Sequence, residues 1–231
     1  MNSQPTGAAI DYGDSGPAEL AVDRRPLLRG VIHQYSAVVA VVAGGILVWI
    51  SSSPRERIAL TVYACAITAM FAMSGAYHRV NWQSDRTRQL ARRFDRSTIF
   101  LAIAGSYTPF ALLVLTGRAA TVVLVAVWLG ALTGTFVNIL WIGAPRWLVT
   151  SIYIAVGWAG LATIPQLFEL AGWVTTGFVL MGGVLYSLGG VVYAARRPDP
   201  LPAVFGYHEV FHTLVLGAAA AQFVAVAIAV S

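Results

Sequence analysis

The apolar residues of this sequence fall in seven long stretches that short polar breaks separate. A helix needs roughly 20 apolar residues to cross the ~30 Å hydrocarbon core of a membrane, and each stretch is close to that length. The breaks carry turn-forming and helix-ending residues, such as the prolines at 54, 198 and 200. The pattern predicts an all-α fold, an integral membrane bundle of seven transmembrane helices, with spans at 31–51, 57–78, 97–116, 119–141, 147–167, 173–194 and 207–230.

The composition agrees with a membrane protein. Of the 231 residues, 58% are hydrophobic and only 11% are charged, whereas a soluble domain carries about 25% charged residues. So few charged side chains cannot cover the surface of a soluble fold, and the composition therefore argues against a soluble enzyme and excludes intrinsic disorder. The single cysteine, Cys65, lies in an apolar stretch, which excludes a disulfide framework.

The distribution of arginine predicts the orientation. All fifteen basic residues are arginines, and if the N-terminus is cytoplasmic only Arg55, Arg57 and Arg118 fall on the outer side. Short cytoplasmic loops carry an excess of basic residues, so we expect the N-terminus inside and the C-terminus outside. Because these arginines lie between apolar stretches, they suit lipid headgroups better than nucleic acid. The prediction is a multi-pass protein of the inner (plasma) membrane, with membrane lipids as its surroundings and no nucleic-acid partner.

Two domains are expected. Residues 1–30 are polar and contain glycine and proline without an early apolar core, which is typical of a flexible cytoplasmic tail rather than a signal peptide. Residues 31–231 form the transmembrane domain. Within it, residues 79–96 are the longest and most basic connection, interpreted either as an amphipathic helix on the inner leaflet or as a solvated basic loop.

Three histidines and one carboxylate are predicted to meet near the cytoplasmic face. His78 ends the second span, Asp95 precedes the third, and His208 and His212 lie in the first two turns of the seventh. Titratable groups at span depth are costly and usually face a cavity or a partner. Their convergence is the main indication of chemistry in this sequence.

The spacing of these residues suits a zinc site. His208 and His212 are four apart, so both imidazoles lie on one helix face, and His78 could supply a third nitrogen, leaving a fourth position for water. The alternative is that these are separate interfacial histidines hydrogen-bonded to backbone or loops. His33, at the inner end of the first span, could be a fourth ligand, a group supporting the ligands, or another interfacial histidine.

Two further residues are candidates for catalysis. Asp95 could accept a proton from a zinc-bound water or orient that water, or it could simply be the N-cap of the third span. Ser74 lies four residues before His78 and so on the same helix face. It could support the same site or make a helix-to-helix hydrogen bond.

A competing interpretation uses residues 208–212 alone. Their sequence, HEVFH, matches the H-E-x-x-H pattern of zinc metalloproteases, in which the glutamate is the general base. This hypothesis requires Glu209 to face the metal, and it leaves His78, Ser74 and Asp95 without a role.

Four motifs, in their order and helix placement, resemble those of one known superfamily. They are Ser74-x-x-x-His78, Asp95 seventeen residues after His78, His208-x-x-x-His212 in the last predicted span, and the pair of segments IAGSYTPF at 103–110 and GGVLY at 182–186. The first three resemble the progestin and adipoQ receptor (PAQR) superfamily, and the last pair resembles its bacterial branch, the hemolysin III family. The resemblance covers about residues 26–231.

The resemblance implies a zinc ion held by His78, His208 and His212, with Asp95 holding a zinc-bound water and Ser74 supporting it. The superfamily is similar to alkaline ceramidases, in which such a site hydrolyses a lipid amide. One departure concerns the residue after Asp95. Bacterial members commonly have histidine there, whereas this chain has Arg96, which cannot titrate near neutrality, so the departure argues against a proton relay at that position.

Three functions follow as hypotheses. The first is a zinc-dependent hydrolase of a lipid amide, acting on membrane lipids. The second is a non-catalytic membrane sensor or receptor in which zinc only ties the helices together. The third is the pore-forming activity that the family name suggests, although neither amphipathic strands nor a charged pore lining supports it.

Overall fold

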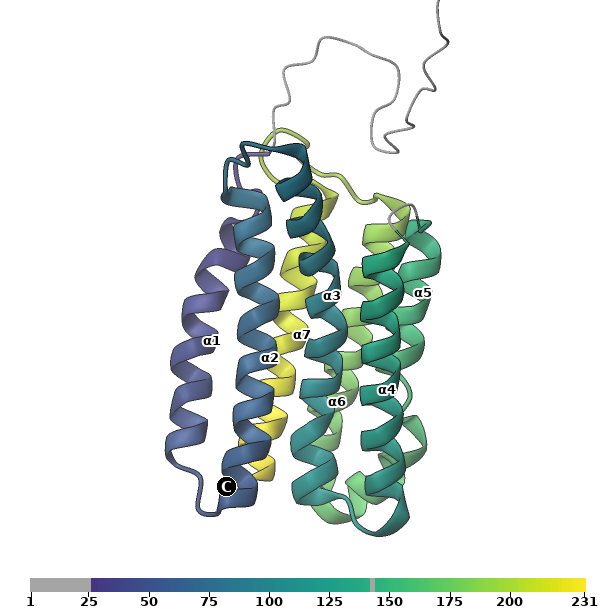
Figure 1. Ribbon diagram of the computed structural model, residues 1–231. Helices are drawn as coiled ribbons and strands as arrows, with labels where there is room; N and C mark the ends of the chain where they lie inside the picture. The colour runs from purple at the N-terminus through teal and green to yellow at the C-terminus, as the bar shows by residue number, and fades with distance from the viewer. Residues whose placement is uncertain (1–25, 142–143) are drawn as a thin grey trace, which may run out of the picture.

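The protein is a bundle of long, roughly parallel and antiparallel helices, described for residues 26–141 and 144–231 by a computed structural model (Figure 1). Most of the predicted tail, residues 1–25, lies outside the described residues. Across the described ranges there is no β-strand, only an isolated bridge between Leu201 and Phe205. The helices are α1 (Val31–Trp49), α2 (Pro54–Arg79), α3 (Asp85–Pro109), α4 (Gly117–Leu140), α5 (Arg146–Gly157), α6 (Ile164–Ala195) and α7 (Tyr207–Ala229).

The all-α membrane bundle is confirmed, but the number of candidate spans differs from the prediction. The described residues contain six helical stretches that are long and apolar enough to cross a membrane, rather than seven. The difference lies in Trp147–Ala195, a single stretch of 49 residues that includes both the fifth and the sixth predicted spans. It comprises α5, a short 3-10 helix at Leu161–Thr163, and α6.

This stretch folds back on itself at Gly172, which has φ 77° and ψ 174° inside α6. Trp158 donates a hydrogen bond from Nε1 to the Ser187 hydroxyl at 2.9 Å, and Thr150 packs against Gly190. Residues earlier in α5 thus meet residues later in α6, as in an antiparallel hairpin. The sequence pattern correctly placed a break between the fifth and sixth predicted spans, but helical structure continues on both sides of Gly172.

Helix α3 begins much earlier than the sequence predicted. Its N-cap is Ser84, so most of the basic stretch 79–96 belongs to the first turns of a membrane-spanning helix and is neither a loop nor a separate surface helix. Within these turns Ala91 is buried while Leu90 and Phe94 are about half exposed. Asp95 therefore lies inside α3, and the interpretation of Asp95 as an N-cap is wrong.

One end of the bundle collects the residues of interest. The start of α1, the end of α2, and the starts of α3 and α7 all lie at the upper end in Figure 1, opposite the C-terminus. Close packing brings the first three helices together, because a Cβ on Gly105 of α3 would lie 2.4 Å from the Cβ of Ala66 in α2, and a Cβ on Gly44 of α1 would lie 2.6 Å from the Cβ of Ala64 in α2. Small residues of this kind let membrane helices approach closely. The fold thus places the ends of α2, α3 and α7 around one space.

Candidate metal centre

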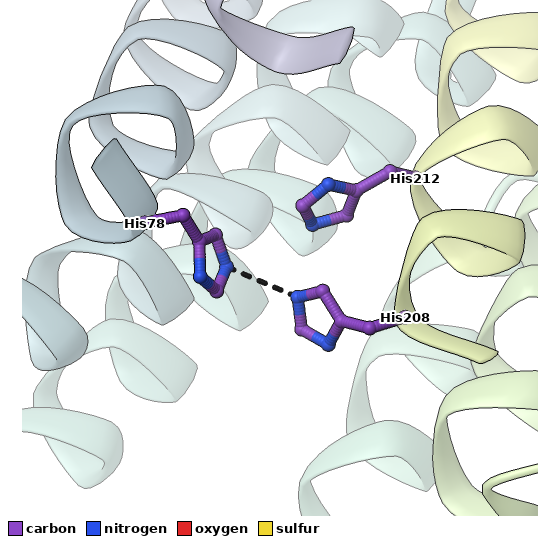
Figure 2. A group of neighbouring side chains, drawn as sticks. All are labelled: His78, His208 and His212. Atoms are coloured by element: carbon purple, nitrogen blue, oxygen red, sulfur yellow. Dashed lines mark hydrogen bonds between the residues drawn. The ribbon is translucent and has the colours of Figure 1, made fainter. Parts of the chain in front are cut away.

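The three predicted histidine ligands meet between α2 and α7 (Figure 2). One ring nitrogen from each of His78, His208 and His212 lies within 4.8 Å of the others. The Nε2 atoms of His78 and His208 are 3.0 Å apart. The predicted convergence of these three side chains is therefore confirmed.

The start of α7 sets the direction of two of these rings. The helix begins after Gly206, whose N–H donates to Oε2 of Glu209 at 2.9 Å. His208 and His212 occupy the first and second turns, and both rings face His78 (Figure 2). His212 is only 2% exposed, so at least one ligand position is shielded from bulk water.

The cluster fits a tetrahedral metal ion. With metal–nitrogen distances of 2.0–2.1 Å, two ligand nitrogens of a tetrahedral site are about 3.4 Å apart, close to the His78–His208 separation. Three imidazoles without a nearby thiolate are a donor set that suits zinc.

Asp95 and Ser74 lie on the wall of the same cavity as the three histidines, which has a volume of about 250 Å³. The Ser74 hydroxyl hydrogen-bonds to the Asp95 carboxyl group, which joins α2 to α3 next to the cluster. Ser74 is 5% exposed. The five residues that the sequence singled out are thus brought together by the fold.

His33 is buried against the cluster rather than exposed at an interface. Its ring stacks on that of His212, with centroids 3.8 Å apart and an angle of 15° between the planes, and it meets Phe71 edge-on. A metal ion bound by His212 would lie near the plane of its ring, and so outside the plane of the His33 ring that stacks on it. This geometry does not favour His33 as a fourth ligand of the same ion.

Glu209 is turned away from the histidines. Its side chain is fully buried, with Oε1 2.7 Å from Nε of Arg29 and Oε2 occupied by the Gly206 N–H. The metalloprotease hypothesis needed this carboxylate at the metal, so the arrangement contradicts it. The role of Arg29 was missed by sequence reasoning, because no periodic spacing links residues so far apart in the chain.

Arg96, the residue after Asp95, is held by two tyrosines. Its guanidinium donates to the Tyr193 hydroxyl at 3.3 Å, and its carbonyl accepts a hydrogen bond from the Tyr153 hydroxyl at 2.8 Å. Both tyrosines line the same cavity. A fixed positive charge therefore stands beside Asp95 at the wall of the cavity.

Away from the histidines the cavity wall becomes mostly apolar. Its lining continues along α3, the turn that follows α3, α6 and α7, through residues such as Ile99, Leu115, Leu167 and Val215. Three of these, Leu115, Leu167 and Val215, are buried members of the hydrophobic core. The site thus combines a polar end, with ligands for a cation, and an apolar extension into the bundle.

These features define an integral membrane helix bundle with a three-histidine cluster between its second and last helices. The sequence model of the family described as "Haemolysin-III related" matches residues 23–223, and the chain belongs to that family. The predicted resemblance to hemolysin III and, through it, to PAQR-type proteins is therefore confirmed.

Named relatives span bacteria and animals. The chain is 28% identical to "Hemolysin-3" of Bacillus cereus over 203 residues, covering 87% of this chain and 89% of that protein. It is 28% identical to "Hemolysin-3 homolog" of Bacillus subtilis (strain 168) over 171 residues, covering 74% and 76%. It is 26% identical to human "Monocyte to macrophage differentiation factor" over 197 residues, covering 84% and 79%. The similarity thus extends over most of each chain.

Proposed function

We propose that this protein is a zinc-dependent hydrolase that cleaves the amide bond of a membrane lipid. The observation that carries the proposal is the meeting of three imidazole nitrogens within 4.8 Å of one another, on the wall of a cavity that also holds Asp95 and Ser74. His78, His208 and His212 are the zinc ligands, and Asp95 and Ser74 are the catalytic candidates. The protein resides in the inner (plasma) membrane with this site near the cytoplasmic face.

Zinc is the metal that best matches the donors. Neutral imidazole is a good ligand for zinc, whereas magnesium and calcium prefer oxygen. Three protein ligands and an open fourth position are typical of catalytic rather than structural zinc sites. Zinc in such a site acidifies a bound water, to a pKa of about 7, and can polarise a carbonyl group.

The chain's own residues have distinct roles in this proposal. Asp95 accepts a proton from the attacking water as a general base and returns it to the amide nitrogen, so that the C–N bond breaks with a neutral amine as the leaving group. Ser74 donates a hydrogen bond to the Asp95 carboxylate and so holds it in one orientation beside His78. Arg96, fixed by Tyr193, stays positively charged and contributes electrostatic stabilisation of anionic groups at the cavity wall without transferring a proton.

The apolar part of the cavity supports a lipid as the substrate. Its walls suit an acyl chain, and the site lies in a bundle that membrane lipids surround. The choice of an amide rests on the similarity of the PAQR superfamily to alkaline ceramidases. The alternative is a membrane sensor with a structural zinc site, and the experiment below separates the two.

The test is metal analysis of the purified protein together with turnover of a ceramide-like amide. We expect stoichiometric zinc in the wild type, its loss in His78→Ala and His212→Ala, and its retention in Thr213→Ala, a change at an exposed neighbour on α7. Full zinc in either histidine variant would remove that residue from the ligand set. Zinc without turnover of any long-chain amide would favour the sensor.

A further inference from the structure

Glu209 occupies an unusual position between two proposed zinc ligands. It follows His208 directly and precedes His212 by three residues, yet its carboxylate is fully buried and contacts Arg29. A buried carboxylate is costly unless it is paired and hydrogen-bonded. Here the Gly206 N–H and the Arg29 guanidinium contact its two oxygens, so the charge is compensated within the protein.

Arg29 comes from a segment that is tied to the start of α7 at further points. We call residues 26–30 the N-terminal strap. The N–H groups of Leu27 and Leu28 donate to the carbonyls of Ala203 and Val204, at 3.2 and 3.3 Å. The strap therefore joins the loop before α7 through its backbone and joins α7 itself through the Arg29–Glu209 pair.

The strap also contacts the third proposed ligand. Gly30 has φ 76°, a conformation that favours glycine, and a Cβ at this position would lie 2.5 Å from the Cβ of His78. The strap thus touches the backbone end of His78 on α2 while Arg29 holds α7. One short segment spans the two helices that supply all three ligands.

We propose that the Arg29–Glu209 pair positions the zinc ligands by fixing the rotation of α7 relative to α2 through the strap. The proposal rests on the zinc centre proposed above and makes Arg29 and Glu209 positioning residues, neither of which touches the metal. Because both His208 and His212 are on the helix that Glu209 anchors, a small rotation of α7 moves both nitrogens relative to His78. Residues that orient metal ligands typically contribute 10–100-fold to metal affinity.

The test measures zinc affinity and the visible absorption spectrum of the cobalt-loaded protein for Glu209→Gln, Arg29→Met and the double variant. Glu209→Gln can still accept the Gly206 N–H but cannot form the ion pair. We expect each single change to weaken zinc binding about tenfold or more and to alter the cobalt spectrum. The double variant should lose no more affinity than the weaker-binding single variant, because both changes remove one interaction. Arg29→Lys should bind zinc more tightly than Arg29→Met.

The matched control is Glu56→Gln. Glu56 likewise accepts a backbone N–H at the start of a helix, from Ser52 at 2.7 Å, but it lies at the opposite end of α2 from His78. This control should leave zinc affinity and the cobalt spectrum unchanged. The positioning role is overturned if Glu209→Gln lowers thermal stability while its zinc affinity and cobalt spectrum match the wild type. A wild-type protein that binds no zinc would instead refute the zinc centre itself.

Discussion

The stacked ring of His33 is buried, and neither of its nitrogens makes a hydrogen bond of good geometry to the described residues. The contact with His212 is that of two flat rings 3.8 Å apart. At the scale of a single residue, His33 therefore resembles an aromatic packing residue more than a ligand.

This packing role predicts opposite effects for two substitutions. His33→Phe keeps a ring against His212 and removes the buried nitrogens, so we expect it to retain zinc and to stabilise the protein by about 1 kcal/mol. His33→Ala removes the ring and should destabilise it by about 2–4 kcal/mol. Thermal unfolding in detergent, with zinc content measured on the same samples, gives both results. Loss of zinc in His33→Phe would show that the nitrogens matter.

Asp95 supports a second prediction at this scale. Asp95→Asn keeps a side chain that can accept the hydrogen bond from Ser74 but cannot take up a proton. We expect zinc to be retained and amide turnover to fall by about 10²–10⁴-fold, the usual contribution of a general base. Turnover close to that of the wild type would remove Asp95 from the catalytic role.

Only part of the site could be predicted from the sequence. His208 and His212 could be predicted because helical spacing puts residues four apart on one face, and His78 could be predicted because its span ends at the same depth. The Arg29–Glu209 contact could not be predicted, because a pair of oppositely charged residues 180 positions apart leaves no periodic signal. The direction of the Glu209 side chain depends on that pair, which is why the metalloprotease pattern was misleading.

At the scale of helices, the start of a helix was predicted correctly where it coincides with the start of an apolar stretch. It was predicted wrongly where the helix extends into polar sequence. The starts of α1 and α7 were predicted at Val31 and Tyr207, where the structure places them. The start of α3 was not predicted, because the Arg-rich stretch was interpreted as a connection before the third span, either a surface helix or a loop, although arginine is a good helix former. Its long side chains can extend toward water while Ala91 packs inward.

The reversal inside α6 supports a prediction about Gly172. Its φ of 77° and ψ of 174° belong to a region that only glycine populates readily. Gly172→Ala should therefore destabilise the protein by about 1–3 kcal/mol, although no neighbouring atom would contact the new methyl group. Thermal unfolding measures the change.

The control for this prediction lies in the same helix. Gly177 is exposed, helical and equally free of close neighbours, so Gly177→Ala should stabilise by up to about 1 kcal/mol. If Gly172→Ala proved as stable as Gly177→Ala, the backbone at 172 would not need the glycine conformation.

At the scale of the whole molecule, the end of the bundle that carries the histidines is also its basic end. Arg79, Arg86 and Arg88 are exposed at this end. At the opposite end, the exposed arginines of the described residues are Arg55, Arg57 and Arg118. The apolar pattern alone could not orient the bundle, because it is the same in either direction. The asymmetry of arginine orients it, and it predicts that the histidine cluster lies near the cytoplasmic face.

Labelling of single cysteines tests this orientation. In a Cys65→Ser background, Ser231→Cys should react with a membrane-impermeant maleimide added to intact cells, whereas Ser3→Cys should react only after permeabilisation. The background change is needed because Cys65 is exposed at the bundle surface. Labelling of Ser3→Cys in intact cells would show that the bundle has the opposite orientation. It would place the histidine cluster on the outer side, where the substrate would have to come from the outer leaflet.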